Sequence, residues 1–305
     1  MDRTLMSASC NLAGLYPPEK QQIWNNHIPW QPIPVHTMPE KDDEILAMKK
    51  FCPRYHEELE LVKHSEEMQE YNEKHAELFE YVESNTGSRV RNADDLENIY
   101  DTLFIEDLYN LTLPEWTKSV YPDQMKDVAA FSFTIDCNNY ILKRLKVGPF
   151  LGKLLDDMKN KISCNARKSH KMAVYSAHDS TIANVLMALD VFDPQSPPYR
   201  SAVLIELLKD EDNSFFVTIN YRNSTTRDPY LLTLPGCDAL CEFDSFSSIV
   251  EKLVPNWEYE CNHNIPSPQY ELNTLSLIGL TVSSVTKLRH LIINITDYNK
   301  KSTSY

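Results

Sequence analysis

Apolar residues recur at helical spacing, among many charged ones, through most of the segment 42–164. Runs such as RYHEELELVKHSEEMQEYNEKHAELFEYV and DDLENIYDTLFIEDLYN are amphipathic, so this segment is predicted to be almost entirely helical. Breaks fall at SNTGS, LTLPEW and VYPD. Before this segment, the pattern predicts a short helix over residues 3–15, ended by Pro17 and Pro18, and an extended stretch over 30–36, where alternating prolines exclude a helix.

The pattern changes after the helical segment. Residues 171–175 form a strand-like run, followed by a His-Asp corner and a helix that ends at Leu189. The run SAVLIELLKDEDNSFFVTINYRN predicts a β-hairpin that turns at 210–213, and CEFDSFSSIVEKLV predicts a last amphipathic helix. Strands are therefore predicted after the helical segment.

The C-terminal tail has a different character. The run LNTLSLIGLTVSSV is apolar for only about a dozen residues before Lys287, Arg289 and His290 interrupt it, whereas a membrane span needs about 20. We interpret residues 262–305 as an irregular extension and not as a membrane anchor.

The composition of the chain narrows the range of functions that it can have. The chain has 305 residues, 42% of them hydrophobic, and a formal net charge of -14. The chain is long and apolar enough to form the core of one large domain or of two intertwined ones. A nucleic-acid groove is excluded, because binding a phosphate backbone requires clusters of Lys and Arg. The negative charge also serves solubility. With only six Gly in the chain, Gly-rich phosphate loops are disfavoured.

The corner formed by His178 and Asp179 is the main candidate site. A strand that leads into a helix directs backbone N–H groups and the positive end of the helix dipole at the loop, which suits an anion. The histidine can donate to a phosphoryl oxygen, and the acid can protonate a leaving alkoxide. Alternatively, Asp179 or Ser180 only caps the helix and His178 is a loop residue. A metal-dependent HD phosphohydrolase is a third interpretation, but it needs further His and Asp on neighbouring helices.

Signals for the cellular compartment conflict. Sequons begin at Asn110, Asn223 and Asn294, which favours an exported protein, but the opening residues show no basic and apolar leader. Taken alone, the opening predicts a cytosolic protein with reduced cysteines. The Cys-x3-Cys pair at 237 and 241 could be half of a zinc site, although no second pair with similar spacing stands out.

A set of motifs in order changes this picture. These motifs are, in order, DRTLMSA, WQPIPVH, CPRYHEEL, YSAHDST, MALDV, PPY, YRN, LTLPGC and WEYEC. Over about residues 2–261 they resemble the histidine acid phosphatase family, above all its prostatic and lysosomal members. The resemblance implies a phosphoglycerate-mutase-like α/β sheet with helices on both faces, formed by residues 1–37 and 167–261. Residues 38–166 would be an inserted helical cap whose Tyr and Trp side chains help to select the leaving group.

The resemblance also implies the chemistry of an acid phosphatase. Arg3 matches an arginine that clamps the substrate phosphate, as a guanidinium fork does well. His178 matches a phosphate-binding histidine and Asp179 the proton donor to the leaving group. The substrates would be small phosphate monoesters, no metal or other cofactor is implied, and a homodimer fits the family.

One departure from the family pattern is large. The family nucleophile is the histidine of an Arg-His-Gly-x-Arg-x-Pro motif on the first strand, and no such motif occurs in this chain. The pair Arg289–His290 lacks the glycine and lies in the tail. We therefore expect an N-terminally truncated member that lacks a central strand, its leader and its nucleophile, and that hydrolyses little as it stands. The alternative is a non-catalytic relative that at most binds phosphate.

The resemblance pairs Cys52 with Cys261 and Cys237 with Cys241 as disulfides. With glycosylation at Asn110 and Asn223, these bonds imply that the complete protein follows an oxidising route and is secreted or lysosomal. The remaining cysteines, Cys10, Cys137 and Cys164, are expected to be buried helical thiols.

Overall fold

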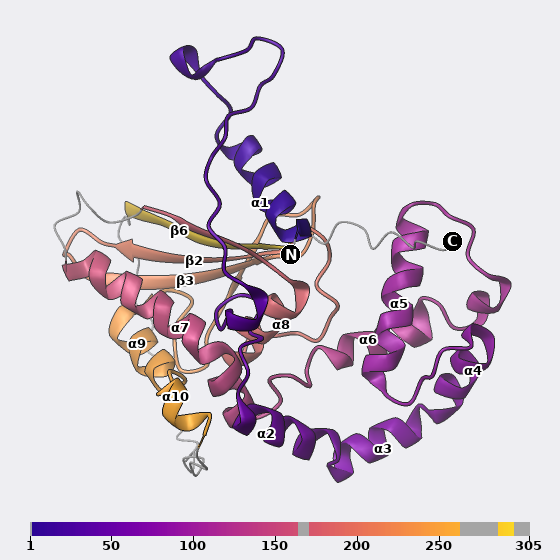
Figure 1. Cartoon of the computed structure of the whole chain (residues 1–305). Helices are drawn as coiled ribbons and strands as arrows, with labels where there is room; N and C mark the ends of the chain where they lie inside the picture. The colour runs from indigo at the N-terminus through magenta and orange to yellow at the C-terminus, as the bar shows by residue number, and fades with distance from the viewer. Residues whose placement is uncertain (1, 164–170, 263–285, 296–305) are drawn as a thin grey trace.

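The computed structural model describes residues 2–163, 171–262 and the backbone of 286–295 (Figure 1). The described residues form a mixed α/β fold, as expected. The helices are α1 (Asp2–Leu15), α2 (Pro53–Lys63), α3 (Glu66–Lys74), α4 (Ala76–Thr86), α5 (Ala93–Leu108), α6 (Asp123–Ser132), α7 (Tyr140–Ser163), α8 (Asp179–Ala188), α9 (Phe243–Glu251) and α10 (Trp257–Glu260), with 3-10 turns at Lys20–Gln22, Glu40–Asp42 and Glu115–Ser119. The strands are β1 (Ala173–Ala177), β2 (Ala202–Lys209), β3 (Phe215–Arg222), β4 (Tyr230–Leu232), β5 (Cys241–Glu242) and β6 (Thr286–Ile295).

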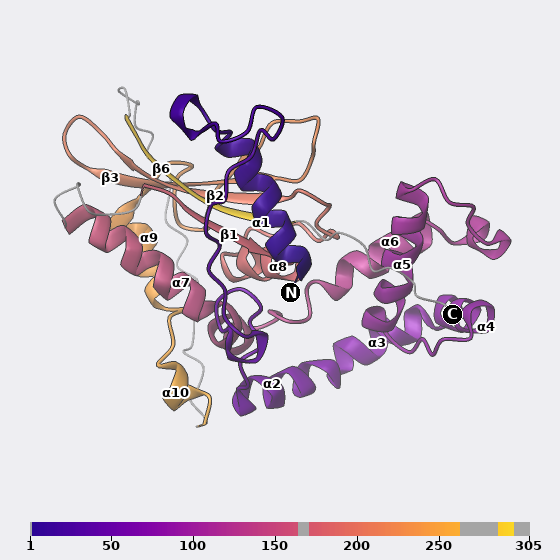
Figure 2. The ribbon, with the colours of Figure 1, turned by 45° about the horizontal axis from the view of Figure 1, so that its top comes forward.

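The described strands form one sheet in the order β1-β6-β2-β3-β4, with β5 paired to β3. The predicted hairpin is confirmed as β2 and β3, which pair antiparallel from Ala202–Arg222 to Lys209–Phe215. Helix α1 lies over one face of the sheet, and α7 and α9 lie against the other (Figures 1 and 2). The expected covering of both faces by helices is therefore present.

The strand β6 differs from the expectation of an irregular tail. Residues 286–295 enter the sheet between β1 and β2, parallel to β1 and antiparallel to β2. The run LIINI is rich in β-branched residues, which favours a strand with neighbours on both sides. The remainder of the tail, 263–285 and 296–305, lies outside the described residues.

Two large cores, and a third small cluster around Cys52 and Cys261, divide the packing of the described residues. One core lies between the sheet and α7, α8 and α9, and includes Phe150, Ile182, Ile205 and Phe246. The other lies inside the helical cap, between residues 68 and 135. The buried residues of α7 from Val147 to Met158 belong to the sheet core, so this helix packs against the sheet.

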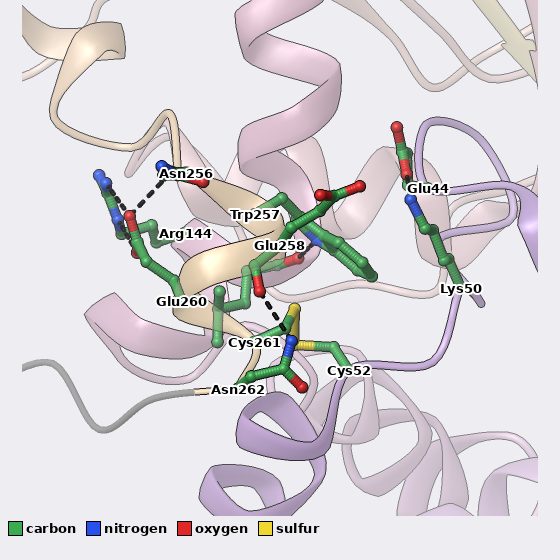
Figure 3. Close-up of a disulfide and its surroundings, with 11 residues drawn as sticks. Glu44, Lys50, Cys52, Arg144, Asn256, Trp257, Glu258, Glu260, Cys261 and Asn262 are labelled. Atoms are coloured by element: carbon green, nitrogen blue, oxygen red, sulfur yellow. Dashed lines mark hydrogen bonds and ion pairs between the residues drawn. A yellow bond between two sulfur atoms is a disulfide. The ribbon is translucent and has the colours of Figure 1, made fainter.

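A junction ties the cap to the α/β part where α2, α7 and α10 meet (Figure 3). The disulfide between Cys52 and Cys261 lies here, as expected, and joins the residue before α2 to the residue after α10. Next to it, Arg144 donates two hydrogen bonds of 2.6 Å to the carboxylate of Glu260. The Trp257 indole N–H donates to the carbonyl oxygen of Leu145 at 3.2 Å.

The other cysteines agree only in part with the expectation. The bond between Cys237 and Cys241 is present, so this pair is not a zinc site. Cys137 is a buried thiol, but it lies in a turn, and burial raises its pKa well above the ordinary range. Cys10 is exposed on α1, contrary to the prediction, and Cys164 lies outside the described residues.

The close approach of α7 to residues 253–255 requires a glycine at position 148. A Cβ atom there would lie 2.2 Å from the carbonyl oxygen of Leu253 and 2.5 Å from Cδ of Pro255. Overpacking of this kind costs about 1–3 kcal/mol. We therefore expect Gly148→Ala to lower the free energy of unfolding by about 2 kcal/mol in urea titrations.

The matched control for this substitution is Gly14→Ala in α1. No atom lies within 4 Å of the added Cβ atom at position 14, so alanine there should leave stability unchanged or raise it by up to about 1 kcal/mol. Equal stabilities of the two variants would contradict the packing described for α7.

Candidate functional site

The corner between β1 and α8 has a defined geometry. His178 occupies the N-cap position of α8 with extended backbone angles, φ -108° and ψ 163°. Its backbone N–H donates to Oγ1 of Thr181 at 3.3 Å, and this buried hydroxyl donates to the carbonyl oxygen of Leu46 at 2.8 Å. Asp179 begins the helix, and its Oδ1 accepts a 2.6 Å hydrogen bond from the N–H of Ser180. The cap position thus belongs to His178 and not to Asp179 or Ser180.

Arg3 and Asp179 line one cavity of about 350 Å³. Arg3 lies in the first turn of α1, which is held beside β1 by a 2.9 Å hydrogen bond from the Ser176 hydroxyl to the Thr4 carbonyl oxygen. This bond connects residues far apart in the sequence and brings α1 close to the corner. The arginine and the acid that the sequence singled out therefore share a cavity at the start of α8.

His178 lies elsewhere. It lines a neighbouring cavity of about 730 Å³, together with α1, β1 and the extended segment 33–38. At the point where the two cavities divide, His178 is still extended and Asp179 is already helical. The larger cavity also reaches His36 and Glu40.

The wall of the smaller cavity comes from the cap and is strongly acidic. Helix α5 contributes Asp94, Glu97, Asn98, Asp101 and Ile105, and the turn after α6 contributes Phe133 and Asp136. Sequence reasoning missed these residues, because their helical spacing shows a common face but not what that face meets. It also expected cap Tyr and Trp here, whereas the aromatic lining residues are Phe133 from the cap and Tyr199 from the α/β part.

The described residues contain no group of three or more His, Cys, Asp or Glu side chains placed to hold a metal ion. In the same part of the chain, no helix has the length and apolar character needed to cross a membrane. Positive groups that the structure places at the corner include Arg3, His178 when it is protonated, and the N-terminus of α8.

The corner combines a helix N-terminus after a strand with an arginine and a carboxyl group in one cavity. This arrangement is typical of an α/β protein that binds an anion.

Comparison with known proteins identifies the family. Residues 1–222 match the histidine phosphatase superfamily (branch 2). The chain belongs to this superfamily.

Curated relatives carry the comparison further. The chain is 35% identical over 290 residues to lysosomal acid phosphatase of Xenopus laevis, which covers 93% of this chain and 66% of that protein. It is 37% identical to prostatic acid phosphatase of Bos taurus over 86% of this chain and 68% of the relative. For human lysosomal acid phosphatase the identity is 36%, over 85% and 62%. The chain thus spans about two thirds of the length of these relatives.

Arg3→Ala tests whether the smaller cavity binds phosphate. We expect inorganic phosphate to bind the variant about 10- to 100-fold more weakly in calorimetric titrations, because the charged hydrogen bonds of one guanidinium are lost. Arg227→Ala is the matched control, since Arg227 is exposed and does not line the cavity. If the two variants bind phosphate equally well, Arg3 is not a phosphate ligand.

Proposed function

We propose that the protein is an acid phosphatase that acts on small phosphate monoesters, with Arg3 and His178 as phosphate ligands and Asp179 as the proton donor to the leaving group. The observation that carries the proposal is the shared cavity of Arg3 and Asp179 at the N-terminus of α8. The names of the relatives support the reaction class.

Each residue has a distinct part in the reaction. The Arg3 guanidinium and the N–H groups of α8 offset the negative charge of the phosphoryl oxygens. This stabilisation matters more as water is excluded from the site. His178, when protonated, adds a further positive charge from the neighbouring cavity. Asp179 in its acid form delivers a proton to the departing oxygen, so turnover should rise toward acid pH.

The nucleophile is the missing part of this site. A phosphohistidine route needs a histidine next to the phosphate, and the Arg-His-Gly-x-Arg-x-Pro motif that carries it in the family does not occur in these 305 residues. His290 does not replace it. Because β6 runs parallel to β1 with Ile295 beside Ala177, His290 lies five residues, or about 16 Å, back along the strand from the corner.

We further propose that the larger cavity is where a nucleophile-bearing segment would lie. Its lining includes His178, the strand β1 and the extended segment 33–38, so a segment placed there would lie beside His178. By this proposal the 305 residues alone bind phosphate but hydrolyse little. The same proposal includes secretion or delivery to lysosomes, glycosylation at Asn110 and Asn223, and a homodimer. Asn110 is exposed, which suits a glycan.

Hydrolysis of an aryl phosphate at about pH 5 tests the proposal. The 305-residue chain should be compared with a chimera that carries, at its N-terminus, a segment with the Arg-His-Gly-x-Arg-x-Pro motif of the family. We expect the chimera to turn over at least about 1000-fold faster, since loss of a nucleophile removes most of the rate enhancement. Equal turnover of the two proteins would show that another nucleophile operates. Phosphate binding without turnover by either would favour a non-catalytic phosphate-binding protein.

Asp179→Asn in the chimera tests the proton donor. Turnover of an alkyl phosphate, whose leaving group is poor, should fall by about 100-fold or more, and turnover of an aryl phosphate much less. Asp190→Asn, a substitution on an aspartate that does not line the cavity, should leave both rates unchanged. Equal losses on both substrates for Asp179→Asn would contradict its role as an acid.

A further inference from the structure

The loop that precedes α2 folds around a buried carboxylate. The side chain of Asp43, a residue only 9% exposed, accepts hydrogen bonds of 2.9 Å and 2.8 Å at Oδ1 from the N–H groups of Ile45 and Leu46. Its Oδ2 accepts a third bond, of 3.1 Å, from the N–H of Ala47. The backbone carbonyl oxygen of Asp43 accepts a further bond, of 2.9 Å, from the N–H of Lys49. Because a buried carboxylate needs such donors, these bonds fix the conformation of the loop.

The same loop is anchored in the sheet core. Met48 is buried in that core and has a φ of 52°. A non-glycine residue keeps this left-handed conformation only where its surroundings impose it, and such residues cluster at functional sites. Ile45 and Leu46 pack against the core as well. The loop is therefore a fixed part of the α/β unit.

One hydroxyl group connects this loop to the corner. The carbonyl oxygen of Leu46 accepts a 2.8 Å hydrogen bond from Oγ1 of Thr181, a buried residue. The same Oγ1 accepts the 3.3 Å bond from the N–H of His178. Since a hydroxyl carries a single proton, the bond to Leu46 leaves a lone pair for His178 and sets the direction of both bonds. The backbone at the start of α8 is thus held by a loop 135 residues away in the sequence.

We propose that Asp43 and Thr181 are positioning residues of the phosphate site. Asp43 fixes the loop, the loop presents the Leu46 carbonyl oxygen, and this oxygen orients the Thr181 hydroxyl. The proposal rests on the proposed function, since it places the phosphate at this corner. Asp43 itself does not bind phosphate, because its negative charge would repel the anion. Its part is to keep His178 and the N–H groups of α8 in place, since preformed donors bind an anion more tightly than mobile ones.

Binding of inorganic phosphate to the full chain, measured by calorimetry at about pH 6, tests this proposal without requiring turnover. Thr181→Val removes the hydroxyl, and we expect phosphate to bind about five- to tenfold more weakly, the effect of one lost hydrogen bond. Thr181→Ser keeps a hydroxyl and should bind within about twofold of the unaltered chain. Asp43→Ala should weaken binding as much as Thr181→Val. The double variant should bind no more weakly than either single variant, because both act through the same contacts.

Two further variants separate positioning from a general loss of stability. Gly148→Ala is the matched control, because it disturbs the packing of α7 and position 148 is not among the described residues that line either cavity. It should bind phosphate as the unaltered chain does. Asp43→Asn is a milder change that keeps one acceptor but places a donor against the N–H of Ala47. It should weaken binding even if Asp43→Ala does not fold.

The outcomes distinguish the two proposals. If the unaltered chain binds no phosphate, the proposed phosphatase site fails. If it binds phosphate and Thr181→Val binds equally well, the site stands and the positioning role is overturned. The role is also overturned if Gly148→Ala weakens binding as much as Thr181→Val. If Asp43→Asn binds normally, or if the two effects add in the double variant, Asp43 does not act through Thr181.

Discussion

The disulfide between Cys52 and Cys261 is the bond on which the relation of the cap to the sheet depends, because it fixes the entry of the chain into the cap and the end of the α/β part at one place. Next to it, the ion pair between Arg144 and Glu260 joins α7 to α10. Burial alone would raise the pKa of Glu260, but hydrogen bonds from Arg144 and from the N–H of Asn256 outweigh it and lower the pKa. The carboxylate is therefore stabilised in its charged form, and the junction resists acid: its contribution to stability is lost only as pH falls through that lowered pKa.

This junction matters because the small cavity has walls from both parts of the molecule. Arg3 and Asp179 come from the α/β part, whereas Glu97 and Asp101 come from α5 in the cap. The cap has its own core, which can hold the α5 face rigid, and the junction helps to set where that face lies relative to the corner. The walls of the small cavity are thus supplied by separately packed units.

Local patterns predicted the hairpin of β2 and β3, the helix α8 and the helical character of the cap, because each depends on residues close in sequence. The meeting of Arg3 with Asp179 and the two disulfides could be predicted only through the family resemblance. Three features escaped prediction: the separate cavity of His178, the acidic face of α5 and the strand β6. Each depends on contacts between segments that are distant in the sequence. From the sequence alone, a residue such as Glu97 is predicted to be an exposed position on a helix.

The position of β6 has a consequence for the synthesis of the chain. Its neighbours β1 and β2 both leave the ribosome earlier, and β6 follows all the other described strands in the sequence. Until it arrives, two strand edges of the nascent protein are open at once, and open edges are templates for pairing with other chains. A strand inserted last into the middle of a sheet is also a non-local and therefore slow contact. The nascent protein is therefore most exposed to aggregation between the synthesis of β2 and the insertion of β6.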